Sequence, residues 1–185
     1  MNTDLFSRRQ VFPDPSISAV ITATRLLFTA YNGYQKGKMT KSDEALRNEV
    51  RSRSENIRSQ IDLLYSKAHK NKQRKLRGSY QDIIDLCDEF ISDARYGLSH
   101  TSNSKQDAAV KMNKKSLKVL IGHDFNTLDK LEKCKEKIEH LIKEIESKST
   151  ESELYDKSTE IRSMLSESKH HFSQRKLIMY GYLDI

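Results

Sequence analysis

The residues best suited to bind a charged ligand form an uninterrupted basic run in the first half of the sequence. Six cationic side chains fall within eleven residues, and no acidic residue separates them: Lys67, Lys70, Lys72, Arg74, Lys75 and Arg77. Phosphates bind such runs, and each contact adds to an affinity that falls as salt rises. The alternative is a solvated helix end, because the dipole at a helix C-terminus favours cations.

Three further arginines precede this run at helical spacing. At 100° per residue, Arg47, Arg51 and Arg58 fall within about 40° of one another on a helix. A guanidinium binds phosphate or carboxylate through paired hydrogen bonds, so this stripe could clamp an anion. The alternative is the rim of a helix–helix contact, with packed stems and solvated heads. We include the stripe with the basic run in a predicted surface for RNA or DNA.

An acidic face follows the basic run. The acidic residues are Asp82, Asp85, Asp88, Glu89 and Asp93, and all but Asp88 share one face of the predicted helix. Carboxylates spaced three and four residues apart on a helix could hold a divalent cation. Helical di-metal sites usually add a Glu-x-x-His pair, and this segment carries none. We therefore predict that the face pairs with the basic end of the preceding helix and that it holds no metal.

The histidines and cysteines give no metal or nucleophile pattern. His123 with Asp124, His140, His170 and His171 do not form H-E-x-x-H. Both cysteines lie on apolar faces, which is typical of small core residues. The common nucleotide-binding and nucleophile-elbow motifs are also missing from the sequence. We predict no metal and no cofactor.

One short motif suggests an enzyme. The segment 95–100 reads Arg-Tyr-Gly-Leu-Ser-His, with four residues between Arg95 and His100. It resembles the R-x4-6-H motif of the HEPN superfamily of helical proteins, which are often dimeric, metal-independent ribonucleases. The resemblance implies that His100 is the acid–base group near the RNA 2′-hydroxyl and that Arg95 steadies the phosphate. The family often has Asn, Asp or His directly after the arginine, where this chain has Tyr96. The alternative is a helix end at Gly97 followed by an exposed histidine.

The elements that position these residues are predicted to be helices. The 185 residues include only two prolines, Pro13 and Pro15, and six glycines. A β-sandwich or barrel needs turn residues every eight to twelve positions, and this chain lacks them. Hydrophobic residues make up 36% of the chain, which disfavours a thick multilayer core. The fold class is therefore all-α, as an elongated bundle of about six helices.

Apolar periodicity and glycines give the expected helix boundaries. We expect helices over 14–31, from 40–42 towards 77, from 79, over 105–121, over 128–145 and from 150. The first is apolar on most faces and is expected to be the most buried. Every glycine is expected to end a helix, and the second helix either projects or breaks near Asn71. Thr150 and Glu153 form a capping box at the start of the last helix. Only a few residues join the last two helices, so these helices should form an antiparallel hairpin.

The charge divides unevenly along a single predicted domain, 1–185. Residues 1–13 form an extension, 14–122 a basic helical core, and 123–185 a hairpin with a tail. The net charge of +7 is concentrated before Ser79, which suggests an anionic partner. The most apolar stretch, 17–31, is too polar to span a bilayer, so no membrane partner is expected. Two unpaired cysteines fit a reducing cytoplasm.

The end of the chain suggests self-association. Its apolar residues are Leu177, Ile178, Met179, Tyr180, Tyr182, Leu183 and Ile185. Such a patch must dock on this chain or on a second copy, and we favour a homodimer. The leading functional hypothesis is a non-catalytic binding or scaffolding protein for RNA or DNA. The alternatives are a HEPN-like ribonuclease and a purely structural, self-associating protein.

Overall fold

The computed structural model describes residues 39–96, 114–146 and 150–179, together with Arg25. These residues form an all-α arrangement of four long helices and no strand. The helices are α2 (Met39–Lys70), α3 (Arg74–Tyr96), α4 (Lys114–Glu146) and α5 (Glu151–Met179). The described part of the chain thus has four helices where six were expected over the whole sequence.

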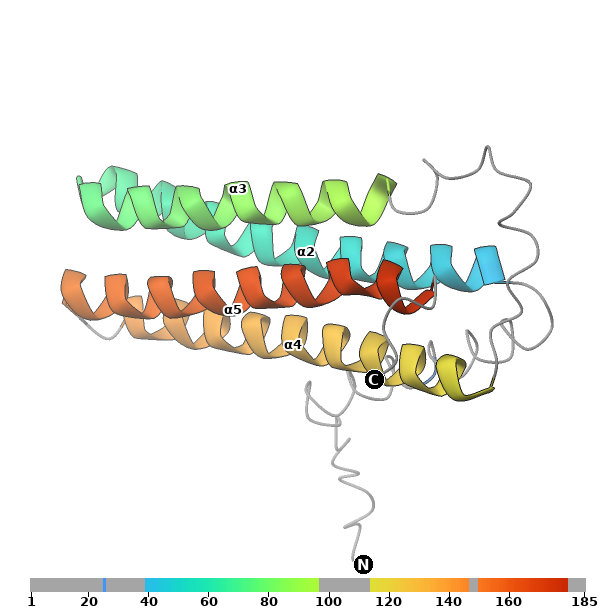
Figure 1. Cartoon of the computed structure of the whole chain (residues 1–185). Helices are drawn as coiled ribbons and strands as arrows, with labels where there is room; N and C mark the ends of the chain where they lie inside the picture. The colour runs from blue at the N-terminus through green and yellow to red at the C-terminus, as the bar shows by residue number, and fades with distance from the viewer. Residues whose placement is uncertain (1–24, 26–38, 97–113, 147–149, 180–185) are drawn as a thin grey trace, which may run out of the picture.

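The four helices form two antiparallel hairpins that lie side by side, as Figure 1 shows. Helix α2 packs on α3, and α4 packs on α5. Between the hairpins, α2 packs on α4 and α3 on α5. These pairs run parallel: Ser79 contacts Ser158 near the hairpin tips, and further along the same two helices Glu89 pairs with Lys169. The N-terminal end of α2 therefore lies at the same end of the bundle as the C-terminal end of α5 (Figure 1).

A single apolar core runs along the bundle axis. All four helices contribute to it, because each places apolar residues three and four positions apart on one stripe. The helix predicted over 128–145 is part of α4, where five residues spaced three and four positions apart form an almost fully buried apolar seam: Leu128, Leu131, Cys134, Ile138 and Leu141. The largest fully buried side chains include Tyr80 and Phe90 of α3.

The predicted start of the last helix is confirmed. The backbone N–H of Thr150 donates to Glu153 Oε2 at 2.9 Å, and the Glu153 N–H donates back to Thr150 Oγ1 at 3.3 Å. These reciprocal bonds form the capping box. The bonds that the Glu153 carboxylate accepts from the backbone N–H and the hydroxyl of Thr150 lower the pKa of Glu153. The predicted α4–α5 hairpin is present as well.

Several predicted boundaries are wrong. Gly78 lies inside α3 and Gly122 inside α4, and a Cβ placed on either would meet nothing within 4 Å. A solvent-facing glycine costs a helix only about 1 kcal/mol, which packing of the opposite face outweighs. Consequently, the helix predicted to end at 121 and the helix predicted to start at 128 are parts of one helix, α4. The predicted helix 14–31 lies outside the described residues except for Arg25, as do the other four glycines.

The α2–α3 turn uses a lysine where a glycine is usual. The Lys72 N–H donates to the carbonyl of His69 at 3.1 Å, and the Gln73 N–H to that of Ala68 at 3.0 Å. This pair of bonds is a Schellman motif, which requires a left-handed residue, and Lys72 supplies it with φ of 59°. Of the two alternatives left open by the sequence, the break near Asn71 is the one present, and α2 does not project to Arg77.

Candidate functional site

The basic run forms the tip of the α2–α3 hairpin, which we call the basic tip. Its six members are Lys67, Lys70, Lys72, Arg74, Lys75 and Arg77. Lys67 and Lys70 end α2, Lys72 lies in the turn, and the other three begin α3. All are exposed except Arg77, which is half-buried. Among the described residues, none of the six forms an ion pair with an acidic side chain.

A hollow of about 480 Å³ opens at the basic tip. Its lining residues are Ala68, His69, Lys70, Lys72, Gln73, Arg74 and Arg77. Arg77 Nη1 lies 3.1 Å from His69 Nδ1, and the rings of Tyr65 and His69 stack with centroids 6.5 Å apart. The hollow thus contains one aromatic residue, His69, whose ring is contacted by Tyr65 and Arg77, together with four cations: Lys70, Lys72, Arg74 and Arg77.

The arginine stripe differs from the basic tip, because each of its members has an acidic partner within the bundle. Arg47 Nε donates to Asp43 at 2.7 Å, and Arg58 Nε donates to Asp88 at 2.6 Å. The bond from Arg58 to Asp88 raises the pKa of Arg58. Arg51 lies 3.6 Å from Glu55. Within the described residues, the arginine stripe is therefore paired with carboxylates of the bundle, whereas the basic tip is not. The two groups do not form one set of solvent-facing cations.

The acidic face of α3 has partners that were not predicted. Glu89 and Asp93 both approach Lys169 of α5, at 2.6 and 3.6 Å. Asp82 lies 3.6 Å from Arg162, also on α5. The prediction that this face pairs with the basic end of α2 is therefore wrong. The parallel α3–α5 contact explains it, because that contact brings the acidic stripe of α3 against the basic stripe of α5.

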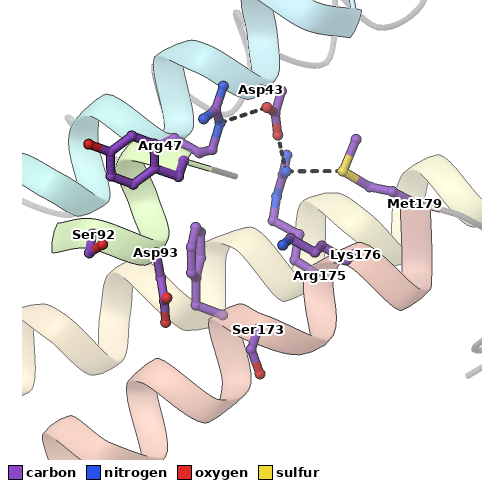
Figure 2. A pocket seen from close by; sticks show the side chains of 10 residues that line it. Asp43, Arg47, Ser92, Asp93, Ser173, Arg175, Lys176 and Met179 are labelled. Atoms are coloured by element: carbon purple, nitrogen blue, oxygen red, sulfur yellow. Dashed lines mark hydrogen bonds and ion pairs between the residues drawn. The ribbon is translucent and has the colours of Figure 1, made fainter. Parts of the chain in front are cut away.

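Sequence reasoning missed a buried charge network at the opposite end of the bundle. Arg175 of α5 is 3% exposed. It donates to Asp124 of α4 at 2.8 Å and also bonds to Asp43 of α2. Asp43 in turn accepts from Arg47, which also donates to the carbonyl of Ala94 at 3.3 Å. Figure 2 shows Asp43 between Arg47 and Arg175, joined to each by a dashed line. In this network the cations Arg47 and Arg175 thus balance the buried carboxylates of Asp43 and Asp124.

A signal for this network was present in the sequence. Arg175 follows Phe172 by three residues and precedes Ile178 by three, so it occupies a core position in the apolar seam of α5. A charge at such a position must be paired, because an isolated buried charge is prohibitively costly. Asp124 occupies the equivalent position among the buried residues of α4.

A cavity of about 310 Å³ lies beside this network, between α2, α3 and α5 (Figure 2). Its lining residues are Asp43, Arg47, Ser92, Asp93, Tyr96, Phe172, Ser173, Arg175, Lys176 and Met179. Among its lining residues, Asp43 pairs with both Arg47 and Arg175, and Asp93 lies 3.6 Å from Lys169 beside the cavity. We assign no ligand to this cavity.

Two histidines stack next to the network. The rings of His123 and His171 lie 3.9 Å apart and nearly parallel. Burial, together with His123 and Lys130, lowers the pKa of His171 to about 4. Rings stacked face to face direct their nitrogen lone pairs alongside each other, so they do not converge on a metal. Within the described ranges, no three His, Cys, Asp or Glu residues are grouped as metal ligands.

The remaining candidates give no assembled site in the described residues. Burial raises the pKa of Cys87 to about 12 and that of Cys134 to about 11, so both are inert thiols. Arg95 lies exposed near the end of α3, whereas His100 lies outside the described residues. The HEPN-like pair therefore stays a prediction.

The apolar end of the chain is described in part. Ile178 and Met179 are buried in the bundle, and Leu177 is 43% exposed. Residues 180–185 lie outside the described part. The homodimer stays a prediction, although two of its seven proposed apolar residues already pack within the chain.

No family model matches this chain, and no curated protein or solved structure matches it either. Among the described residues, no helix has the length and apolar character needed to cross a bilayer. Function must therefore be argued from the geometry of the bundle itself.

Proposed function

We propose that this protein binds nucleic acid without sequence preference, through the phosphate backbone and the basic tip. The bundle acts as a binding or scaffolding element and presents the tip at one end. Six cations on a rigid hairpin give a dense positive surface, which attracts a polyanion by releasing the counterions condensed on it. The HEPN-like alternative has no further support from the described residues.

The observation that carries this proposal is the contrast between the basic tip and the arginine stripe. Arg47, Arg51 and Arg58 all meet carboxylates of their own bundle. The tip cations have no acidic partner within the described residues, so their charge is left for an external anion. Lys72 adds support. A non-glycine residue in the left-handed region costs stability, so a lysine at this position favours a role for its charge in binding.

The test is a salt series of fluorescence anisotropy titrations with a labelled 20-base-pair duplex. Six phosphate contacts predict a log–log slope of about −5, at −0.9 for each phosphate. The triple variant Lys72→Glu, Arg74→Glu and Lys75→Glu should abolish binding. Its circular dichroism and melting should stay close to wild type, because all three side chains are exposed.

A matched control reverses the charge of three exposed lysines on α4: Lys115→Glu, Lys118→Glu and Lys143→Glu. This variant changes the net charge by the same amount but leaves the basic tip intact. Equal loss in both variants would show that only net charge matters and would contradict the proposal. Absence of binding at low salt, or binding that does not respond to salt, would overturn it.

A further inference from the structure

We propose that the preferred ligand of the basic tip is single-stranded nucleic acid, with one unpaired base stacked on the ring of His69. This inference rests on the proposed function and adds the strandedness of the ligand. The basic tip carries the aromatic ring of His69, which a purely electrostatic surface does not require.

The position of His69 favours a base-binding role. Its ring lines the hollow of about 480 Å³ between α2 and α3, and the residue is exposed. Lys70, Lys72, Arg74 and Arg77 line the same hollow. A nucleotide seated there would therefore meet an aromatic surface for its base and cations for its phosphates. Pockets of this size are in the range that holds small organic ligands.

The ring is also held in place before any ligand arrives. Tyr65, one helical turn earlier on α2, stacks on His69 with the two ring planes 14° apart. Arg77 of α3 lies 3.1 Å from His69 Nδ1, which restrains the ring from the other side of the turn. A restrained ring loses little conformational freedom on binding, so more of the stacking energy contributes to affinity.

The preference for a single strand over a duplex follows from whether the base faces of each ligand can reach the His69 ring. In a duplex, the base faces are stacked on one another and cannot reach a side chain at the surface. A single strand exposes its bases, and proteins that bind it combine a cationic track with aromatic side chains. The hollow of the basic tip contains both of these groups, which a duplex could use only in part.

The test compares two 12-nucleotide probes with the same phosphates. One is single-stranded oligo(dA), and the other is the same backbone without bases. Wild type should bind the base-containing strand about five-fold or more tightly than the abasic strand, the low end expected for one base–aromatic stack. In the His69→Ala variant this ratio should fall to about one. The slope with salt for the abasic strand should not change.

His140→Ala is the matched control, because His140 is an exposed histidine on α4 that does not line the hollow. It should keep the wild-type ratio. Equal affinity of wild type for both strands would overturn this inference while leaving nucleic-acid binding in place. Absence of binding to either strand would overturn the proposed function together with it. A ratio above one that persists in His69→Ala would place the base elsewhere and would also contradict the inference.

Discussion

Arg175 of α5 donates two hydrogen bonds to the carboxylate of Asp124 on α4, from Nε at 2.8 Å and from Nη2 at 3.3 Å. Both side chains are almost fully buried. The same guanidinium bonds to Asp43 of α2, so one residue ties together three helices from both hairpins.

Removing this guanidinium should be strongly destabilising. In Arg175→Met, Asp124 loses its cation and Asp43 keeps only Arg47. An uncompensated buried charge costs about 3–5 kcal/mol, so the free energy of unfolding should fall by that amount. Urea denaturation followed by circular dichroism measures it. The double variant Arg175→Met with Asp124→Leu should recover part of the loss, and no recovery would contradict the pairing.

Acidification should weaken the fold through His171. Its pKa is about 4 in the folded protein against an ordinary value of 6.5. Between these values the unfolded chain binds a proton that the folded one does not. The free energy of unfolding should therefore fall as pH drops from about 6.5 towards 4.

Urea midpoints at pH 7.5 and 5.5 measure this effect. The variant His171→Phe keeps a ring to stack on His123 and should lose most of the difference. His140→Phe, at an exposed position, should keep it. A wild-type midpoint that is the same at both pH values would contradict the prediction.

Replacing Lys72 by glycine should stabilise the protein. Glycine adopts the left-handed conformation without the steric cost that a lysine bears, roughly 1 kcal/mol or more. The melting temperature of Lys72→Gly should rise by a few degrees, since 1 kcal/mol corresponds to about 2–4 °C in a chain of this size. Lys72→Ala removes the same charge without relieving the strain, so it should not melt higher.

Neutralising the acidic face of α3 should have a small effect. Asp82 and Glu89 face Arg162 and Lys169 in exposed ion pairs, which contribute roughly 0–1 kcal/mol each. The variant Asp82→Asn, Asp85→Asn and Glu89→Gln should melt within a few degrees of wild type, and a chelator should change neither protein. A melting temperature of wild type that rises clearly with millimolar Mg²⁺ would instead indicate a metal site.

The sequence predicted elements where a local pattern decides the structure. Thr150 and Glu153 satisfy each other's backbone within one turn, so the start of α5 depends on no distant contact. The seam from Leu128 to Leu141 was equally clear, because a helix must bury an apolar stripe. The basic tip was predicted as a sequence run at the end of the second helix, whereas its place at a hairpin tip was not predicted.

The sequence failed where tertiary packing decides. Gly78 and Gly122 were given the role of helix ends, yet the turn that ends α2 uses Lys72 in the position that glycine usually takes. The partners of the acidic face depend on the parallel packing of α3 and α5, which no local pattern encodes. Arg175 was overlooked because a charged residue is normally expected at the surface, whereas this one occupies a core position in the apolar seam of α5.

The pairing of two hairpins also sets an order of events in folding. Within a hairpin, hydrogen-bonded residues lie closer in sequence, as do Asp124 and Arg175, which are 51 apart, whereas Ser79 and Ser158 are 79 residues apart and Asp43 and Arg175 are 132 apart. Closing the longer loops costs more chain entropy, so each hairpin should form before the two dock. The bond from Arg175 to Asp43 joins the two hairpins and belongs to that last step, whereas Arg175 and Asp124 already lie within one hairpin. Loss of the bond to Asp43 should therefore speed unfolding more than it slows the formation of either hairpin.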